Sequence, residues 1–182
     1  MKKIIIICII ALLLVSSLGC DKALTADEEY EDGTANIIQS LQRALATEAA
    51  AEAEGKSFDL LQRYYVELNK IVEDSLRNAS TMAVPNKYTE AHLYLINGIT
   101  IMLDYYPAKI AHAEMIKVAA DEETAMRTKL QRGAISQEDF DAYIEEVLEK
   151  QNTRREVLTN IRSAADDQLN LFTISLEKAK NS

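Results

Sequence analysis

Residues that could bind metals or carry out acid–base chemistry are few in this chain of 182 residues. It contains two histidines, two cysteines and no tryptophan. A helical carboxylate–metal site needs a Glu-x-x-His motif, which places two ligands one turn apart. Neither His92 nor His112 has a carboxylate three or four residues away. The sequence therefore predicts no metal site and no cofactor, and we expect His92 to be a hydrogen-bonded core residue.

Motifs for nucleotide binding and nucleophilic catalysis are absent from the sequence as well. There is no P-loop, no dinucleotide-binding fingerprint and no Gly-x-Ser-x-Gly motif. The formal net charge of −9 argues against nucleic-acid binding, which requires a clustered basic face. We therefore expect a protein that is not an enzyme and does not bind nucleic acid.

Two tyrosine pairs remain as candidates for a binding site. Tyr64-Tyr65 and Tyr105-Tyr106 lie on two expected helices, at heights that match if the helices run antiparallel. One interpretation is core packing with the hydroxyls at the rim. The other is a ligand groove between these helices, close to Pro107.

The first 20 residues carry the most specific pattern in the chain. Two lysines follow Met1, and residues 4–15 form an uninterrupted apolar run. Twelve helical residues span about 18 Å, which is short of the ~30 Å hydrocarbon core of a bilayer. The pattern is typical of a secretory signal peptide over residues 1–19 rather than of a membrane-spanning helix.

This segment ends in Ser17-Leu18-Gly19-Cys20, and it resembles the signal peptide of bacterial lipoproteins. Gly19 and Cys20 match that family's lipobox, whereas Ser17 and Leu18 depart from its usual leucine and small residue. The resemblance implies that the Cys20 thiol carries lipid, with acyl chains such as palmitate, after cleavage before it. It also implies an extracytoplasmic protein anchored to the cell membrane or the outer membrane. A plain secretory leader and an uncleaved anchor are the alternatives.

The remainder of the chain predicts an all-α protein. Good helix formers dominate, and apolar residues recur at three- and four-residue spacing. We expect helices over about 34–54, 58–83, 88–132 and 137–179, within one domain that spans 34–182. Residues 20–33 are acidic and weakly apolar, which predicts a flexible tether. Residues 48–54 consist of alanine and glutamate and are expected to bury little.

Helix lengths predict an uneven antiparallel bundle. The last two helices should each reach roughly 65 Å, whereas the second should reach only about 40 Å. We therefore expect a bundle at one end and a long, coiled-coil-like helical hairpin over 111–155, with its tip at Gly133. Pro107 should either kink the third helix or interrupt it. The alternative is that the chain folds back at Pro107 into a compact five-helix bundle.

The expected function follows from the leader and the hairpin. We expect a membrane-anchored helical lipoprotein of the bacterial cell envelope that serves as a non-enzymatic interaction or structural module. Glu138 and Asp139 follow a capping residue, Ser136, at the hairpin tip and are the candidate contacts for an envelope protein partner. The alternative is a ligand-binding or sensory four-helix module with a pocket near Pro107, lined by Tyr64, Tyr65, Tyr105 and Tyr106.

Overall fold

The computed structural model describes residues 23–182, and this part of the chain is helical without any strand. Its elements are α1 (Ala26–Ala53), α2 (Phe58–Thr81), a short 3₁₀ helix η2 (Asn86–Tyr88), α3 (Thr89–Gln131) and α4 (Gln137–Lys180). The all-α helical bundle predicted from the sequence is thereby confirmed. The predicted signal peptide and Cys20 lie outside the described residues.

The start of α1 corrects the expected tether. The helix begins at Ala26 rather than at Thr34, so residues 26–33 are helical. Thr25 and Glu28 form a capping box, in which each side chain bonds the other residue's backbone N–H. Acidic side chains in a first turn also interact favourably with the helix dipole. The acidic composition that indicated a solvated tether therefore belongs to a helix N-terminus, and Tyr30 of this segment is buried.

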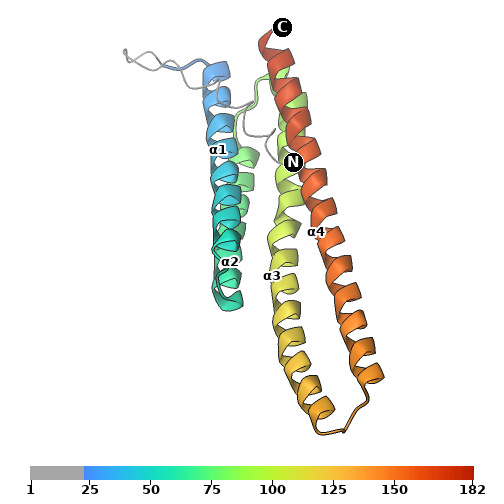
Figure 1. Cartoon of the computed structure of the whole chain (residues 1–182). Helices are drawn as coiled ribbons and strands as arrows, with labels where there is room; N and C mark the ends of the chain where they lie inside the picture. Colours follow the sequence, from blue (N-terminus) through green and yellow to red (C-terminus); the bar gives the residue numbers. More distant parts are fainter. Residues whose placement is uncertain (1–22) are drawn as a thin grey trace.

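The helices pack in chain order, with α2 against α1 and α3, and α3 against α4 (Figure 1). The turn from α1 to α2 contains Gly55, and the turn from α3 to α4 contains Gly133. Both glycines have positive φ, at 62° and 69°, a conformation that costs other residues strain. Gly98 has a different role, because a Cβ there would lie 2.9 Å from Leu169 Cδ2. Its missing side chain lets α3 and α4 approach closely.

Helix α3 is continuous through Pro107. The alternative, in which the chain folds back at Pro107 into a compact five-helix bundle, is therefore wrong. In Figure 1, α3 and α4 run side by side past the end of the α1–α2 pair, and the turn that joins them lies at the far end of the molecule. The coiled-coil character of this hairpin stays a prediction.

The hydrophobic core lies at the end of the molecule where all four helices meet. Val72 of α2, Leu95 and Ile99 of α3, and Ala165 of α4 are each 0% exposed. Beyond the α1–α2 pair, most residues at the contact between α3 and α4 are only half-buried, as a pair of helices has no further neighbour to cover it. No helix in the described part of the chain is long and apolar enough to cross a bilayer.

Candidate functional site

A buried ion pair joins α1 to α3 beside Pro107. Lys109 Nζ lies 2.6 Å from Glu48 Oε1, and these side chains are only 14% and 6% exposed. The two hydroxyls of the predicted tyrosine pair on α3 also converge on this carboxylate. Tyr105 donates a hydrogen bond of 2.9 Å to Glu48 Oε1, and Tyr106 one of 3.3 Å to Oε2. Glu48 is therefore the centre of a polar network inside the bundle.

A second carboxylate extends this network to α2. Tyr65 donates a hydrogen bond of 2.8 Å to Glu52 Oε1, and Lys109 forms an ion pair with the same oxygen. The rings of Tyr65 and Tyr106 face each other with centroids 6.4 Å apart. The Lys109 ammonium also lies 5.4 Å from the centroid of the Tyr65 ring, a cation–π distance. The network thus connects three helices.

Three of the four tyrosines predicted to line a groove therefore come together, but their hydroxyls are not free for a ligand. The hydroxyl of Tyr65 donates a hydrogen bond to Glu52, and the hydroxyls of Tyr105 and Tyr106 donate hydrogen bonds to Glu48. Tyr64 is not part of this cluster, because it packs against Lys56, whose Nζ lies 5.2 Å from its ring centroid. Glu48 and Lys109 lie between these helices and bind the tyrosine hydroxyls, and a ligand groove at the tyrosines stays a prediction.

The protonation states in this network follow from burial and from the ion pair. Burial alone would lower the pKa of Lys109, but the hydrogen bonds to Glu48 and Glu52 and the negative charge of Glu48 outweigh it and raise the pKa above its ordinary value. Burial, assisted by the negative charge of Glu48, raises the pKa of Tyr105 to about 12. At neutral pH the lysine is therefore charged and the tyrosine neutral, which suits a fixed network of donors and acceptors.

Sequence reasoning missed the two residues that define this network. Glu48 lies in the alanine–glutamate stretch that was expected to bury little, yet it is 5% exposed. The available signal was the spacing of Glu48 along α1. Buried residues recur there in three- and four-residue steps, and Glu48 is one of them: Leu41, Ala44, Glu48 and Ala51. A glutamate on an apolar face needs a buried cation, and Lys109 lies one turn away from Tyr105 on the facing helix.

A second polar cluster connects the start of α1 to the start of α3 and the end of α4. The rings of Tyr30 and Tyr88 stack with centroids 4.7 Å apart. Tyr88 donates a hydrogen bond to the Glu31 carboxylate, and Lys180 Nζ lies 3.2 Å from the other oxygen of that group. His92 Nδ1 lies 3.4 Å from the Tyr30 hydroxyl, which confirms a hydrogen-bonded histidine in the bundle. These contacts hold the first turns of α1 in place.

The hairpin tip places Glu138 and Asp139 on the first turn of α4, where both are exposed. Asp139 accepts hydrogen bonds from the Ser136 hydroxyl at 2.7 Å and from its backbone N–H at 3.0 Å. These two bonds lower the pKa of Asp139. The prediction that Ser136 caps this helix is thereby confirmed, and Ser136 and Asp139 form a capping box. Asp139 is engaged in the turn itself, whereas Glu138 makes no such bond in the described part of the chain.

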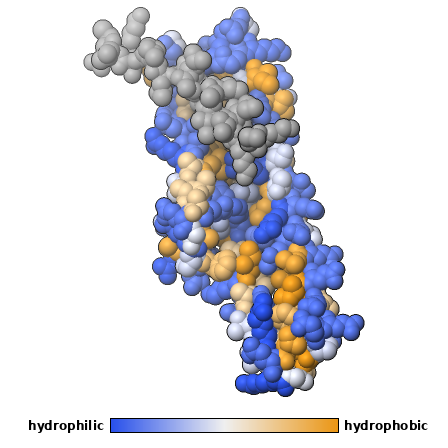
Figure 2. Space-filling model, viewed as in Figure 1, coloured by the Kyte–Doolittle hydropathy of each residue, from blue (hydrophilic) through white to orange (hydrophobic). Residues whose placement is uncertain are grey.

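Large apolar side chains are exposed along the hairpin. Val118 is 54% exposed and Leu148 52%. Figure 2 shows hydrophobic residues gathered on the part of the hairpin that extends beyond α1 and α2. Surface patches of this kind often mark contacts with other proteins.

Residues 23–182 bring together no group of three or more His, Cys, Asp or Glu side chains that could hold a metal ion. No known family model matches the chain, and no curated protein or solved structure matches it either. Its function must therefore be argued from the leader and from the geometry above.

Proposed function

We propose that the protein is a lipid-anchored lipoprotein of the bacterial cell envelope, and that its α3–α4 hairpin contacts a protein partner. The observation that carries this proposal is that the start of α1 and the hairpin tip lie at opposite ends of the molecule (Figure 1). Residues 21–25 alone separate Cys20 from α1. Even fully extended, they would reach only about 20 Å, so the start of α1 would stay close to the membrane surface.

The direction of the helices then determines what faces away from the membrane. The start of α1 and the end of α4 lie at the same end of the molecule, opposite the α3–α4 turn (Figure 1). Helix α3 contains 43 residues, which corresponds to about 65 Å at 1.5 Å per residue. A molecule anchored at Cys20 can therefore project its tip several tens of ångströms from the bilayer. Exposed Val118 and Leu148 lie on this projecting part.

The ligand-binding alternative has weaker support. It requires free polar groups beside the tyrosine pairs, but Glu48 and Glu52 already accept the hydroxyls of Tyr65, Tyr105 and Tyr106. Leu148 on the hairpin, by contrast, is 52% exposed. We therefore place the interaction site on the hairpin and treat the tyrosine network as part of the scaffold.

Site-specific photo-crosslinking in native membranes tests this proposal. A photoreactive amino acid at Glu138 should give discrete adducts with an envelope protein. The same amino acid at Lys70, which is exposed on α2, is the matched control and should give none. Equal labelling from both positions, or adducts from Lys70 alone, would contradict the assignment of the hairpin as the contact surface.

A further inference from the structure

Arg154 and Arg155 of α4, here called the arginine pair, are exposed and make no ion pair within residues 23–182. Neither has an aspartate or glutamate three or four residues away, which is the spacing at which side chains meet on a helix. Lys150 of the same helix, by contrast, lies 2.6 Å from Glu146 Oε1. In a chain with a formal net charge of −9, the arginine pair is therefore a local excess of positive charge.

The register between α3 and α4 places the arginine pair beside His112. The Tyr143 hydroxyl donates a hydrogen bond of 3.2 Å to the Ala119 carbonyl, and a Cβ at Gly98 would lie 2.9 Å from Leu169 Cδ2. The two helices run antiparallel (Figure 1). Counting along them from either contact puts His112 opposite the turn of α4 that contains the arginine pair. The three side chains therefore lie close together where the hairpin leaves the bundle.

His112 is the buried member of this cluster. Its Nδ1 atom is buried and makes no hydrogen bond in the described part of the chain. Burial lowers the pKa of His112, and the positive charges of the arginine pair and of Lys109 act in the same direction. Lys109 is compensated by its ion pairs with Glu48 and Glu52. The arginine pair is thus the uncompensated charge beside a neutral imidazole.

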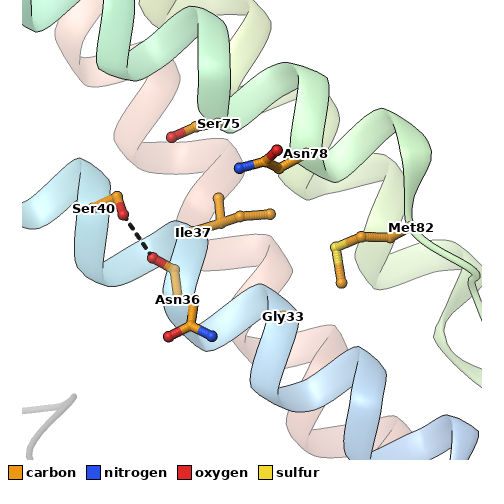
Figure 3. Close-up of a pocket in the computed structure, with 7 residues that line it drawn as sticks. All are labelled: Gly33, Asn36, Ile37, Ser40, Ser75, Asn78 and Met82. Carbon is orange, nitrogen blue, oxygen red and sulfur yellow. Dashed lines mark hydrogen bonds between the residues drawn. The ribbon is translucent and has the colours of Figure 1, made fainter.

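A groove between α1 and α2 has no such charge to offer (Figure 3). The residues that line it include no charged side chain. Asn78 of this groove is exposed, and the Ser40 hydroxyl already donates a hydrogen bond of 2.9 Å to the Asn36 carbonyl, drawn as a dashed line. An anion that entered this groove would lose hydration without gaining a counter-ion. The arginine pair supplies that counter-ion.

The charge of the cluster selects the kind of anion. A guanidinium presents a planar fork of donors that matches the oxygens of a carboxylate or a phosphate. A carboxylate has one negative charge and two oxygens, which one arginine can engage by itself. A phosphate monoester carries about −1.5 to −2 charges at pH 7 and three acceptor oxygens. A phosphate group therefore matches two arginines better than a carboxylate does.

We infer that Arg154 and Arg155 form a binding site for a phosphate group, with His112 beside it. The two guanidinium groups donate hydrogen bonds to the phosphate oxygens. The bound negative charge offsets the arginine charges that act on His112, so phosphate binding and protonation of the imidazole favour each other. The site lies at the base of the hairpin, and the inference is independent of the partner contact proposed for the tip.

Titration of the full-length protein in detergent with inorganic phosphate tests this inference. The chain contains two histidines, so ¹³C-histidine labelling gives two sets of ring signals, which His112→Gln assigns. The His112 signals should shift in a saturable manner, with Kd near the millimolar range. Those of His92, about 30 Å away along α3, should not shift. Sodium chloride keeps the ionic strength constant, because salt screens exposed charges.

Glycerol 3-phosphate is the second probe, and saturable binding of either probe supports the site. The tighter of the two identifies whether the ligand is a free phosphate ion or a phosphate ester. Arg154→Gln and Arg155→Gln should each weaken binding about tenfold, because each removes a charged donor. Arg43→Gln, at an exposed position of α1, is the matched control and should leave the Kd unchanged. Glutamine and arginine favour a helix similarly, and thermal melting checks that the variants are folded.

Sulfate tests the coupling to His112, because it has the shape of phosphate and stays doubly charged between pH 7.5 and pH 5.5. Its Kd should tighten roughly tenfold over this range, and the change should vanish in His112→Gln. Acetate should bind at least about tenfold more weakly than phosphate, since it engages one arginine. Equal shifts at His92, Kd values insensitive to both arginine variants or to pH, acetate binding as tight as phosphate, or no saturation up to about 100 mM would overturn the inference.

Discussion

Removing Glu48 should destabilise the protein more than removing any exposed carboxylate. In Glu48→Met the Lys109 ammonium stays buried, with a side chain 14% exposed, and two tyrosine hydroxyls lose their acceptor. Breaking a buried ion pair typically costs about 3–5 kcal/mol. Lys109 keeps Glu52, whose side chain is 41% exposed, as a second partner. The cost should therefore fall to about 2–4 kcal/mol.

Urea denaturation measures this change in the free energy of unfolding. With an m-value of about 2 kcal/mol/M, the midpoint should fall by roughly 1–2 M. Glu67→Met, an exposed position on α2, is the control and should change the stability by about 0.5 kcal/mol or less. Circular dichroism at zero urea checks that the variants remain helical.

A double-mutant cycle then tests the pairing directly. Lys109→Met alone leaves Glu48 as a buried charge and should cost a similar amount. Replacing both charged groups leaves no uncompensated charge in the bundle. The double variant should therefore lose less unfolding free energy than the two single variants lose together, and the difference should be at least about 2 kcal/mol. Additive effects within about 0.5 kcal/mol would refute the argument that the two groups stabilise each other inside the bundle.

Three further predictions concern the anchor, the core and acid sensitivity. Cys20→Ala should release the protein from membranes or leave an unprocessed precursor, and a normally processed, membrane-bound variant in fractionation would contradict lipidation. Phe172→Ala, at a position 3% exposed in the bundle, should lower the free energy of unfolding by about 3–5 kcal/mol, whereas Val147→Ala on the hairpin should lower it by roughly 1 kcal/mol or less. Burial lowers the pKa of His92 and, together with nearby cations, that of His112. The two neutral histidines contribute fully to stability above the unfolded pKa of about 6.5, and this contribution is lost as the pH falls below that value. The urea midpoint should therefore drop between pH 7.5 and pH 5. An unchanged midpoint would contradict the prediction of acid sensitivity.

The helical class of the fold could be read from the sequence because the information is local. Apolar spacing, good helix formers and capping residues such as Ser136 act over a few positions along the chain. The lengths of α3 and α4 follow from the same pattern, and so does the short turn at Gly133. The boundary of α1 could not be placed in this way. Its first turns are acidic and sparse in apolar residues, and their burial depends on Tyr88 and Lys180, which lie far away in the sequence.

The interior polar contacts were beyond the reach of sequence reasoning for a similar reason. A glutamate among alanines in α1 resembles a solvated residue until the facing helix is known. Only the packing of α1 and α2 against α3 places Lys109 and Tyr105 at Glu48.

The amino-acid sequence by itself thus determined the all-α class and the long helices α3 and α4, and it carries the resemblance of residues 1–20 to a lipoprotein signal peptide. Each of these depends on residue type and spacing within one segment. The tertiary structure decided that residues 26–33 are helical and that Tyr65, Tyr105 and Tyr106 gather around a buried ion pair between Glu48 and Lys109. These features arise from contacts between segments, because the free energy of burying Glu48 depends on which groups the neighbouring helix places beside it.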